Sequence, residues 1–127
     1  MIAGIGSDII RVERIRRLLN KYPRFTARVF TENEIQYCVV KANPAESYAA
    51  RFAAKEAVMK ALGTGWDKDV NFKDIEVVKA ASGRPRILLR GGAETIRRSR
   101  GIGEIHLSLS HEREYALAFV ILEFQKT

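Results

Sequence analysis

Residues 51–65, RFAAKEAVMKALGTG, are the stretch of this 127-residue chain that decides its fold. Alanine, leucine, methionine, lysine and glutamate are strong helix formers, and Gly63 stands where a left-handed glycine commonly ends a helix. The helical pattern extends back to Glu46, just after an Asn-Pro pair that breaks regular structure. We therefore expect one long helix from about Glu46 to Leu62.

Polar residues form two stripes on this helix. Glu56 and Lys60 are four residues apart and share one face, while Arg51 and Lys55 form the neighbouring stripe. A weak surface ion pair is one explanation of such a Glu–Lys spacing. The alternative is a ligand site, because the stripes lie beside small alanines and precede the Gly-Thr-Gly segment 63–65, whose backbone amides could approach a phosphate.

Segments before this helix predict both strands and helices. Residues 2–10 are apolar and contain glycine, as in a short strand, and apolar residues at helical spacing then predict a helix over 11–22. Thr31 and Glu34 form a capping-box signature for a second short helix that reaches about Val40.

Beyond residue 65 the pattern changes to strands. Alternating apolar residues predict strands near 75–77, 87–89, 105–111 and 115–124. The first two are joined by a hairpin connection at 81–85, and a short basic helix between the second and third ends near Gly101. Helices and strands cluster without regular alternation and no internal repeat is evident, so we expect an α+β fold in a single domain over residues 1–127.

Charge is distributed unevenly along the chain. There are 22 Lys and Arg against 15 Asp and Glu, a formal charge of +7, and residues 11–28 alone carry seven basic side chains against one acid. A concentrated basic segment favours an acidic partner or a nucleic-acid footprint over a generally adhesive surface.

Cysteine content and hydropathy indicate the compartment. The single cysteine, Cys38, excludes an intrachain disulfide framework and a Cys-rich zinc site. No apolar run approaches the roughly 20 residues that cross a bilayer, and Asp8 comes too early for a signal peptide, so we expect a cytoplasmic protein. A chain this short has little room for a closed cleft, and a sizeable pocket is expected to be shared between subunits.

Several common functional motifs are absent from the sequence. Gly4-Ile5-Gly6 lacks the third glycine of a dinucleotide fingerprint, no P-loop pattern occurs, and His111-Glu112 has no second histidine at zincin spacing. These absences argue against a dehydrogenase, a P-loop NTPase and a zinc protease.

A few polar residues occur within or at the ends of otherwise apolar segments. Asp8 ends an apolar strand, where a charge is costly unless it is paired or bound to a cation. Asp8 either caps the helix that follows or belongs to a ligand site. In the second case Asp8 and Glu56 would be two carboxylate ligands of Mg²⁺, and substrate phosphates would complete the coordination of the ion. Ser108, Ser110 and His111 form a further polar group, which a hydrogen-bonded turn would explain equally well.

At these residues the sequence resembles the holo-[acyl-carrier-protein] synthases, the small bacterial class of 4′-phosphopantetheinyl transferases. The blocks that carry the resemblance are GIGSDI at 4–9, residues 51–65, GRP at 83–85, SLSH at 108–111 and YALA at 115–118. They follow the family order over nearly the whole chain, and the block at 51–65 is the most specific.

The resemblance implies a reaction. Enzymes of this family transfer 4′-phosphopantetheine from coenzyme A to a serine of apo acyl carrier protein, release adenosine 3′,5′-bisphosphate and serve fatty acid biosynthesis. By the same resemblance Asp8 and Glu56 hold Mg²⁺, Lys60 stabilises or protonates the leaving group, and His111 lies against the phosphates or the pantetheine. Glu56, directly or through a metal-bound water, is the preferred base for the incoming serine.

The resemblance also implies binding surfaces and an assembly. Residues implied to contact coenzyme A are Arg51, Lys55, Lys60, Gly63, Thr64, Gly83, Arg84, Pro85, Ser110 and His111, with the Gly-Arg-Pro loop near the adenine or the 3′-phosphate. Residues implied to dock the acidic carrier protein are Arg14, Lys21, Arg24 and Arg28, with Leu18 as an apolar anchor. Members of this length resemble compact homotrimers with sites between subunits, and neither nucleic acid nor a membrane is an expected partner.

One departure from the family and two rival interpretations remain. Trp66-Asp67 stands where the family commonly has small or aliphatic residues, so the local pocket wall is expected to differ.

A nucleic-acid-binding module using residues 11–28 and the basic run near Arg97 would explain the charge, but it leaves Asp8 and Glu56 without a role. Arg98 and Arg100 belong to the same run. An inactive adaptor with the same fold would bind a carrier protein without modifying it.

Overall fold

The structure is a computed structural model that describes residues 1–64 and 70–126. One antiparallel sheet has the strand order β1-β5-β4, with β1 at Ile2–Arg11, β5 at Tyr115–Phe124 and β4 at Ile102–His111. A second, two-stranded antiparallel sheet pairs β2 (Ile75–Lys79) with β3 (Pro85–Leu89). The expected α+β class is confirmed.

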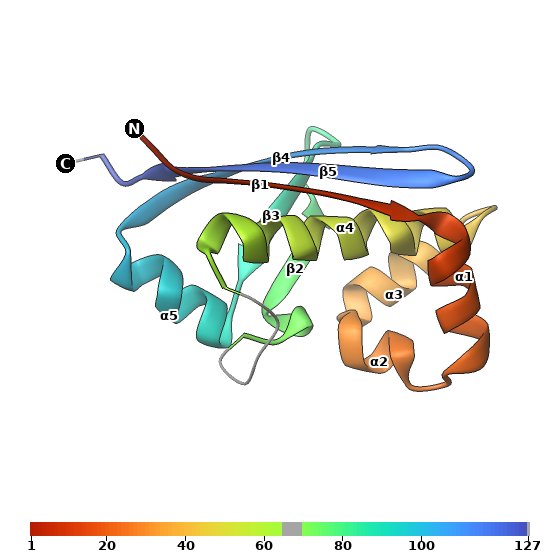
Figure 1. Cartoon of the computed structure of the whole chain (residues 1–127). Coiled ribbons are helices and arrows are strands. Elements are labelled where there is room, and N and C mark those ends of the chain that lie inside the picture. The colour runs from red at the N-terminus through yellow and green to blue at the C-terminus, as the bar shows by residue number, and fades with distance from the viewer. Residues whose placement is uncertain (65–69, 127) are drawn as a thin grey trace.

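Helices cover one side of the larger sheet (Figure 1). The long helix α4 (Pro44–Leu62) runs beneath the strands; α1 (Val12–Lys21), α2 (Phe25–Val29) and α3 (Glu32–Val39) gather at one end, and α5 (Gly91–Ser99) lies at the other. A single 3₁₀ turn, η1 (Phe72–Asp74), precedes β2. None of the described helices is long and apolar enough to span a bilayer.

The start and end of α4 follow from its terminal residues. The helix begins two residues before the expected start, because Pro44 suits the first turn, where its missing N–H would have no partner. It ends at Gly63, which has a φ of 75°, a left-handed conformation that favours glycine. The capping box of Thr31 and Glu34 is also confirmed at the start of α3. The sequence did not predict α2 and η1, which are too short to show a periodicity.

Helix α4 is the centre of the core, because fifteen of its nineteen residues are buried. A helix that is buried on nearly every side cannot show the apolar stripe of a surface helix. The residues that stay partly or fully exposed are Pro44, Glu46, Glu56 and Lys60. Three of these four are charged, so the few places where α4 reaches the surface carry its polar chemistry.

Two glycines bring β1 into backbone contact with α4. A Cβ added at Gly6 would lie 2.0 Å from the carbonyl oxygen of Ala57, and one added at Gly4 would lie 2.3 Å from that of Ala61. Any side chain at these positions would push the strand away from the helix. The contact therefore sets the distance between α4 and Asp8, which is two residues beyond Gly6 on the same face of β1.

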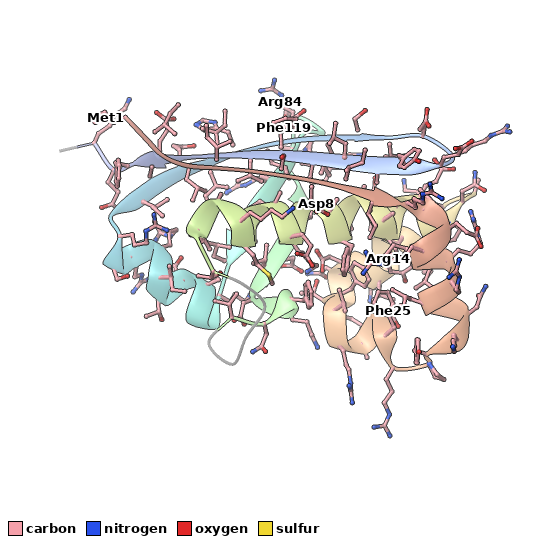
Figure 2. The ribbon with its side chains drawn as sticks, in the orientation of Figure 1. Met1, Asp8, Arg14, Phe25, Arg84 and Phe119 are labelled. Atoms are coloured by element: carbon pink, nitrogen blue, oxygen red, sulfur yellow. The ribbon has the colours of Figure 1, made fainter. Side chains whose placement is uncertain are left out.

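The face of the larger sheet turned away from α4 is apolar and open. Ile9 is 62% exposed and Phe119 is 50% exposed, and Ile5 and Ile121 are exposed beside them. No element of the described chain covers this face, and Figure 2 shows Phe119 on it. We call these four residues the open sheet face.

Candidate active site

Asp8 and Lys60 form an ion pair between β1 and α4. Lys60 Nζ donates to Asp8 Oδ1 at 3.0 Å and to the carbonyl oxygen of Ser7, also at 3.0 Å. The Asp8 side chain is only 17% exposed and points from β1 toward α4 (Figure 2). Asp8 does not cap the following helix, whose N-cap is Arg11 without a side-chain cap bond. The capping alternative for Asp8 is therefore wrong.

Glu56 lies one turn before Lys60 on the same face of α4. Burial raises the pKa of Glu56, and the negative charge of Asp8 raises it further, whereas Lys60 and Arg14 act in the opposite direction. Two carboxylates that interact in this way repel each other, and a cation between them would relieve the repulsion. The structure thus brings together the two acids and the lysine that the sequence analysis placed in one site.

This acidic pair fits a magnesium ion by the chemistry of its donors. Carboxylate oxygens are the ligands that Mg²⁺ prefers, and a site with one or two of them usually keeps water and substrate phosphate as its other ligands. Within residues 1–64 and 70–126 no three His, Cys, Asp or Glu side chains gather to hold a metal ion by themselves. Asp8 and Glu56 would therefore hold the ion only together with substrate or water oxygens.

Other residues implied to contact coenzyme A surround a small pocket on the β4 side of α4. The pocket has a volume of about 190 Å³ and is lined in part by Arg51, Gly83, Pro85 and His111. Gly83 has a φ of 89° in the β2–β3 turn, which glycine adopts without strain. His111 Nδ1 lies 3.2 Å from Glu46 Oε1, which orients the imidazole. We call this the His111 pocket.

The acidic pair and the His111 pocket belong to opposite edges of the sheet. Asp8 is on edge strand β1 and pairs with Ala118 of the central strand, which in turn pairs with Leu109 of the other edge strand. Two strand spacings separate the backbones of Asp8 and Leu109, about 10 Å. The two groups of site residues therefore do not converge on one point within a single chain.

The contact with coenzyme A expected for Lys55 is wrong. Its side chain is fully buried, and Nζ donates to Glu34 Oε1 at 2.8 Å, to the carbonyl of Phe72 at 3.0 Å and to that of Ile75. Burial lowers the pKa of Lys55, and the charge of Glu34 opposes this effect. The stripe of Arg51 and Lys55 faces the core because other elements pack on that side of α4, and Lys55 ties α3 to the start of β2.

Gly63 and Thr64 do not offer free amides to a phosphate. The amide of Gly63 donates to the carbonyl of Lys60, and that of Thr64 donates to the carbonyl of Met59, so both complete the end of α4. Thr64 Oγ1 is buried without a hydrogen-bond partner and is the group left available there. Of the segments singled out in the sequence, Gly65 and Trp66-Asp67 lie outside the described residues.

Arg84 and Ser110 lie on the side of the sheet away from α4. Figure 2 shows Arg84 above the sheet, whereas Asp8 lies below it. Ile105, Leu107 and Leu109 pack toward the core, so the exposed Ser110 faces the opposite way. Within one chain these two residues are thus remote from the acidic pair.

The residues implied to dock a carrier protein form a surface on α1 and α2. Arg14, Lys21, Arg24 and Arg28 are exposed and Leu18 is half-buried. We call these five residues the basic docking surface. Beside it lies an open pocket of about 690 Å³, lined by Tyr22, Pro23, Arg24, Phe25, Arg28, Val29, Asn71 and Phe72. The positive charge of Arg14 acts to lower the pKa of Glu56, against the larger effects of burial and Asp8.

Sequence reasoning missed several residues of the His111 pocket. Tyr37, Ser47 and Lys79 line it from α3, α4 and β2, and Glu46 binds His111. None of them belongs to a motif, and they are distant from one another in the sequence. Only the fold brings them together, so no sequence signal for this group was available.

The fold and the site together define a class of protein. The model of the 4′-phosphopantetheinyl transferase superfamily matches residues 4–120, and the chain belongs to this superfamily. A holo-[acyl-carrier-protein] synthase from Halothermothrix orenii is 48% identical over 124 residues, which cover 97% of this chain and 98% of the relative. Within the superfamily the chain thus groups with the holo-[acyl-carrier-protein] synthases.

Solved structures of such synthases share the fold over nearly the whole chain. The synthase from Neisseria meningitidis matches with a TM-score of 0.88 and 38% identity, covering 97% of this chain and 99% of that one. The synthase from Bacillus anthracis, in complex with CoA (3′,5′-ADP), matches with a TM-score of 0.81 and 41% identity, covering 98% and 99%.

Proposed function

We propose that this chain transfers 4′-phosphopantetheine from coenzyme A to a serine of apo acyl carrier protein, in a reaction that depends on Mg²⁺ and releases adenosine 3′,5′-bisphosphate. The observation that carries this proposal is the convergence of Asp8, Glu56 and Lys60 where β1 touches α4. The names of the relatives support the carrier protein as acceptor, and the complex of the Bacillus anthracis enzyme supports coenzyme A as donor.

The reaction forms one P–O bond and breaks another. The serine oxygen attacks the phosphorus that bears pantetheine, the bond from this phosphorus to the bridging pyrophosphate oxygen breaks, and adenosine 3′,5′-bisphosphate leaves. Glu56, directly or through a water molecule, is the proposed acceptor of the serine proton. Lys60 places its positive charge beside the leaving oxygens. Bound Mg²⁺ would neutralise negative charge on the phosphates.

Mass spectrometry of an apo carrier protein tests the transfer. After incubation with the chain, coenzyme A and Mg²⁺, the carrier should gain the mass of one phosphopantetheine group. Asp8→Asn and Glu56→Gln should abolish the gain and weaken Mg²⁺ binding measured by calorimetry, whereas Glu32→Gln, an exposed acid on α3, should leave both unchanged. Full activity of both site variants would contradict the metal assignment, and no transfer by the unmodified chain would contradict the proposed function.

The basic docking surface is proposed to receive the carrier protein. Its cations attract an acidic partner at a distance and make association sensitive to salt. Arg24→Glu and Arg28→Glu should raise the KM for the carrier protein with little change in kcat, and 0.5 M salt should reduce the difference between these variants and the unmodified chain. Tight binding of RNA or DNA with no binding of the carrier protein would instead favour the nucleic-acid module.

The open sheet face is proposed to be covered by other copies of this chain, in a homotrimer with sites between subunits. Burying its exposed isoleucines and phenylalanine would supply the apolar contact, and a neighbouring copy could bring a His111 pocket to the acidic pair. Mixed assemblies test this arrangement. Asp8→Asn and His111→Ala chains are each expected to be inactive alone. When equal amounts are refolded together, about a quarter of the shared sites should combine an intact Asp8 from one chain with an intact His111 from another, so about a quarter of full activity should return. No recovery would contradict a shared site.

A further inference from the structure

We propose that the open pocket beside the basic docking surface binds a fatty acid, and that the bound fatty acid competes with the carrier protein. The pocket lies between the end of α1, helix α2 and the start of η1, and we call it the Phe25 pocket. Its described lining shares no residue with the acidic pair or the His111 pocket. The binding follows from the pocket alone, whereas the competition rests on the proposed function.

Aromatic side chains form much of the wall of the Phe25 pocket. The ring centroid of Phe25 lies 6.4 Å from that of Phe52, and Phe52 stacks on Phe72 with 5.4 Å between the centroids. Phe52 is a buried residue of α4, so the two rings that line the pocket rest on the core. Figure 2 shows Phe25 below α4, on the side away from the sheet, so this pocket and the open sheet face lie on opposite sides of the chain.

The size and lining of the Phe25 pocket suit a hydrocarbon chain. Its volume of about 690 Å³ lies within the range of about 300–1,000 Å³ that is typical of small-molecule sites. A ligand body with many polar groups would lose hydrogen bonds to water in such a place, whereas methylene groups gain from being buried. Five of the eight described lining residues are apolar or aromatic: Tyr22, Pro23, Phe25, Val29 and Phe72.

The exposed rim of the Phe25 pocket is positively charged. Arg24 and Arg28 line it one helical turn apart, since the amide of Arg28 donates to the carbonyl of Arg24 at 3.1 Å. In the parts of the chain that the structure describes, no ion pair involves either arginine. Lys21 Nζ lies 5.6 Å from the ring centroid of Tyr22 and adds a third cation nearby. Guanidinium groups bind carboxylates through paired hydrogen bonds, so a carboxylate at the rim and a hydrocarbon chain inside fit this pocket together.

The two rim arginines also belong to the basic docking surface. A carboxylate bound to Arg24 and Arg28 would neutralise two of the four cations that are proposed to attract the carrier protein. A bound fatty acid should therefore raise the KM for the carrier protein and leave kcat unchanged.

Calorimetry with decanoate, octanoate and decanol tests the binding. Affinity should rise about fourfold for each methylene that the pocket buries on going from octanoate to decanoate. Decanol lacks the carboxylate and should bind about tenfold more weakly than decanoate. Arg24→Gln and Arg28→Gln should each weaken decanoate binding about tenfold. Arg86→Gln removes the same charge from an exposed residue of β3 and should not weaken it, so it is the matched control.

A substitution in the apolar wall gives a second test. Tyr22 is 51% exposed, so its replacement should keep the fold. Tyr22→Asp places a negative charge in the pocket and should abolish decanoate binding, whereas Tyr22→Phe should retain it. In transfer assays decanoate should raise the KM for the carrier protein in the Tyr22→Phe variant but not in Tyr22→Asp, each compared with itself without decanoate.

Three results would overturn the inference. Equal affinity for decanoate and decanol, or equal losses in the rim variants and in Arg86→Gln, would show unspecific adsorption. No binding of decanoate, with a raised KM for the carrier protein in Tyr22→Asp, would assign the pocket to the carrier protein itself. Binding of decanoate without a change in this KM would exclude the competition. Failure of the proposed function would appear differently, as an absence of transfer without decanoate, and displacement of decanoate by the carrier protein in calorimetry would still decide the competition.

Discussion

The contact between β1 and α4 at Gly6 leads to a sharp prediction about activity. A Cβ at residue 6 would lie 2.0 Å from the carbonyl oxygen of Ala57, and real Cβ atoms do not come closer than about 3.0 Å. Gly6→Ala must therefore displace the strand by at least the difference, about 1 Å. Asp8 moves with the strand and away from Glu56 and Lys60. A misplacement of this size at a reacting centre costs roughly a hundredfold in rate.

The assay for Gly6→Ala separates positioning from stability. We expect kcat/KM for phosphopantetheine transfer to fall about a hundredfold, and the free energy of unfolding to fall by about 1–3 kcal/mol, the usual cost of overpacking. Gly103→Ala in β4 is the matched control, because an added Cβ there comes no closer than 3.2 Å to another atom and should change activity little.

The outcome that would refute this reasoning is a folded Gly6→Ala protein with normal kcat/KM. It would mean that the backbone contact does not set the position of Asp8. If Gly6→Ala does not fold, Gly4→Ala provides the second measurement, since its Cβ would lie 2.3 Å from the Ala61 carbonyl oxygen and farther from Asp8. Its effect on kcat/KM should be smaller than that of Gly6→Ala.

Three other predictions concern stability, pH and assembly. Lys55→Met leaves the carboxylate of Glu34 unpaired in the core and should lower the free energy of unfolding by about 3–5 kcal/mol, and adding Glu34→Gln should recover part of this loss in urea denaturation. Hydrogen bonds from Arg97 lower the pKa of Glu94 from 4.5 to about 2, so ionised Glu94 stabilises the folded chain at neutral pH. This stabilisation is lost as the pH falls from 4.5 to about 2. The melting temperatures of Glu94→Gln and of the unmodified chain should therefore differ at pH 7 and converge near pH 2. Ile9→Lys on the open sheet face should yield monomers in analytical ultracentrifugation, whereas a multimer of unchanged size would exclude this face as the contact.

Local signals in the sequence predicted most of the secondary structure. The capping box at Thr31 and Glu34 and the terminal Gly63 are short-range features, and each determines a helix end through contacts within a few residues. The strands over 105–111 and 115–124 alternate because one face of their sheet packs on α4. Such features need no knowledge of the tertiary fold.

The direction that each polar residue of α4 faces could not be predicted from its spacing. Helical periodicity correctly placed Glu56 and Lys60 on one face and Arg51 and Lys55 on another, but it could not say that the second face meets α3 and the start of β2. The same limit applies to Asp8, whose partner Lys60 is 52 residues away. The resemblance placed Asp8, Glu56 and Lys60 in one site, but neither it nor the spacing predicted the ion pair between Asp8 and Lys60.

The glycine contact between β1 and α4 has a consequence for the speed of catalysis. Because main-chain atoms of the strand touch main-chain atoms of the helix at Gly6 and Ala57, the spacing of the two carboxylates does not depend on rotamers of intervening side chains. Peptide groups inside hydrogen-bonded strands and helices move far less than side chains do. In the proposed metal site, the negative pair would thus be preorganised for a cation before any substrate arrives, and little reorganisation energy would remain to be supplied during the reaction.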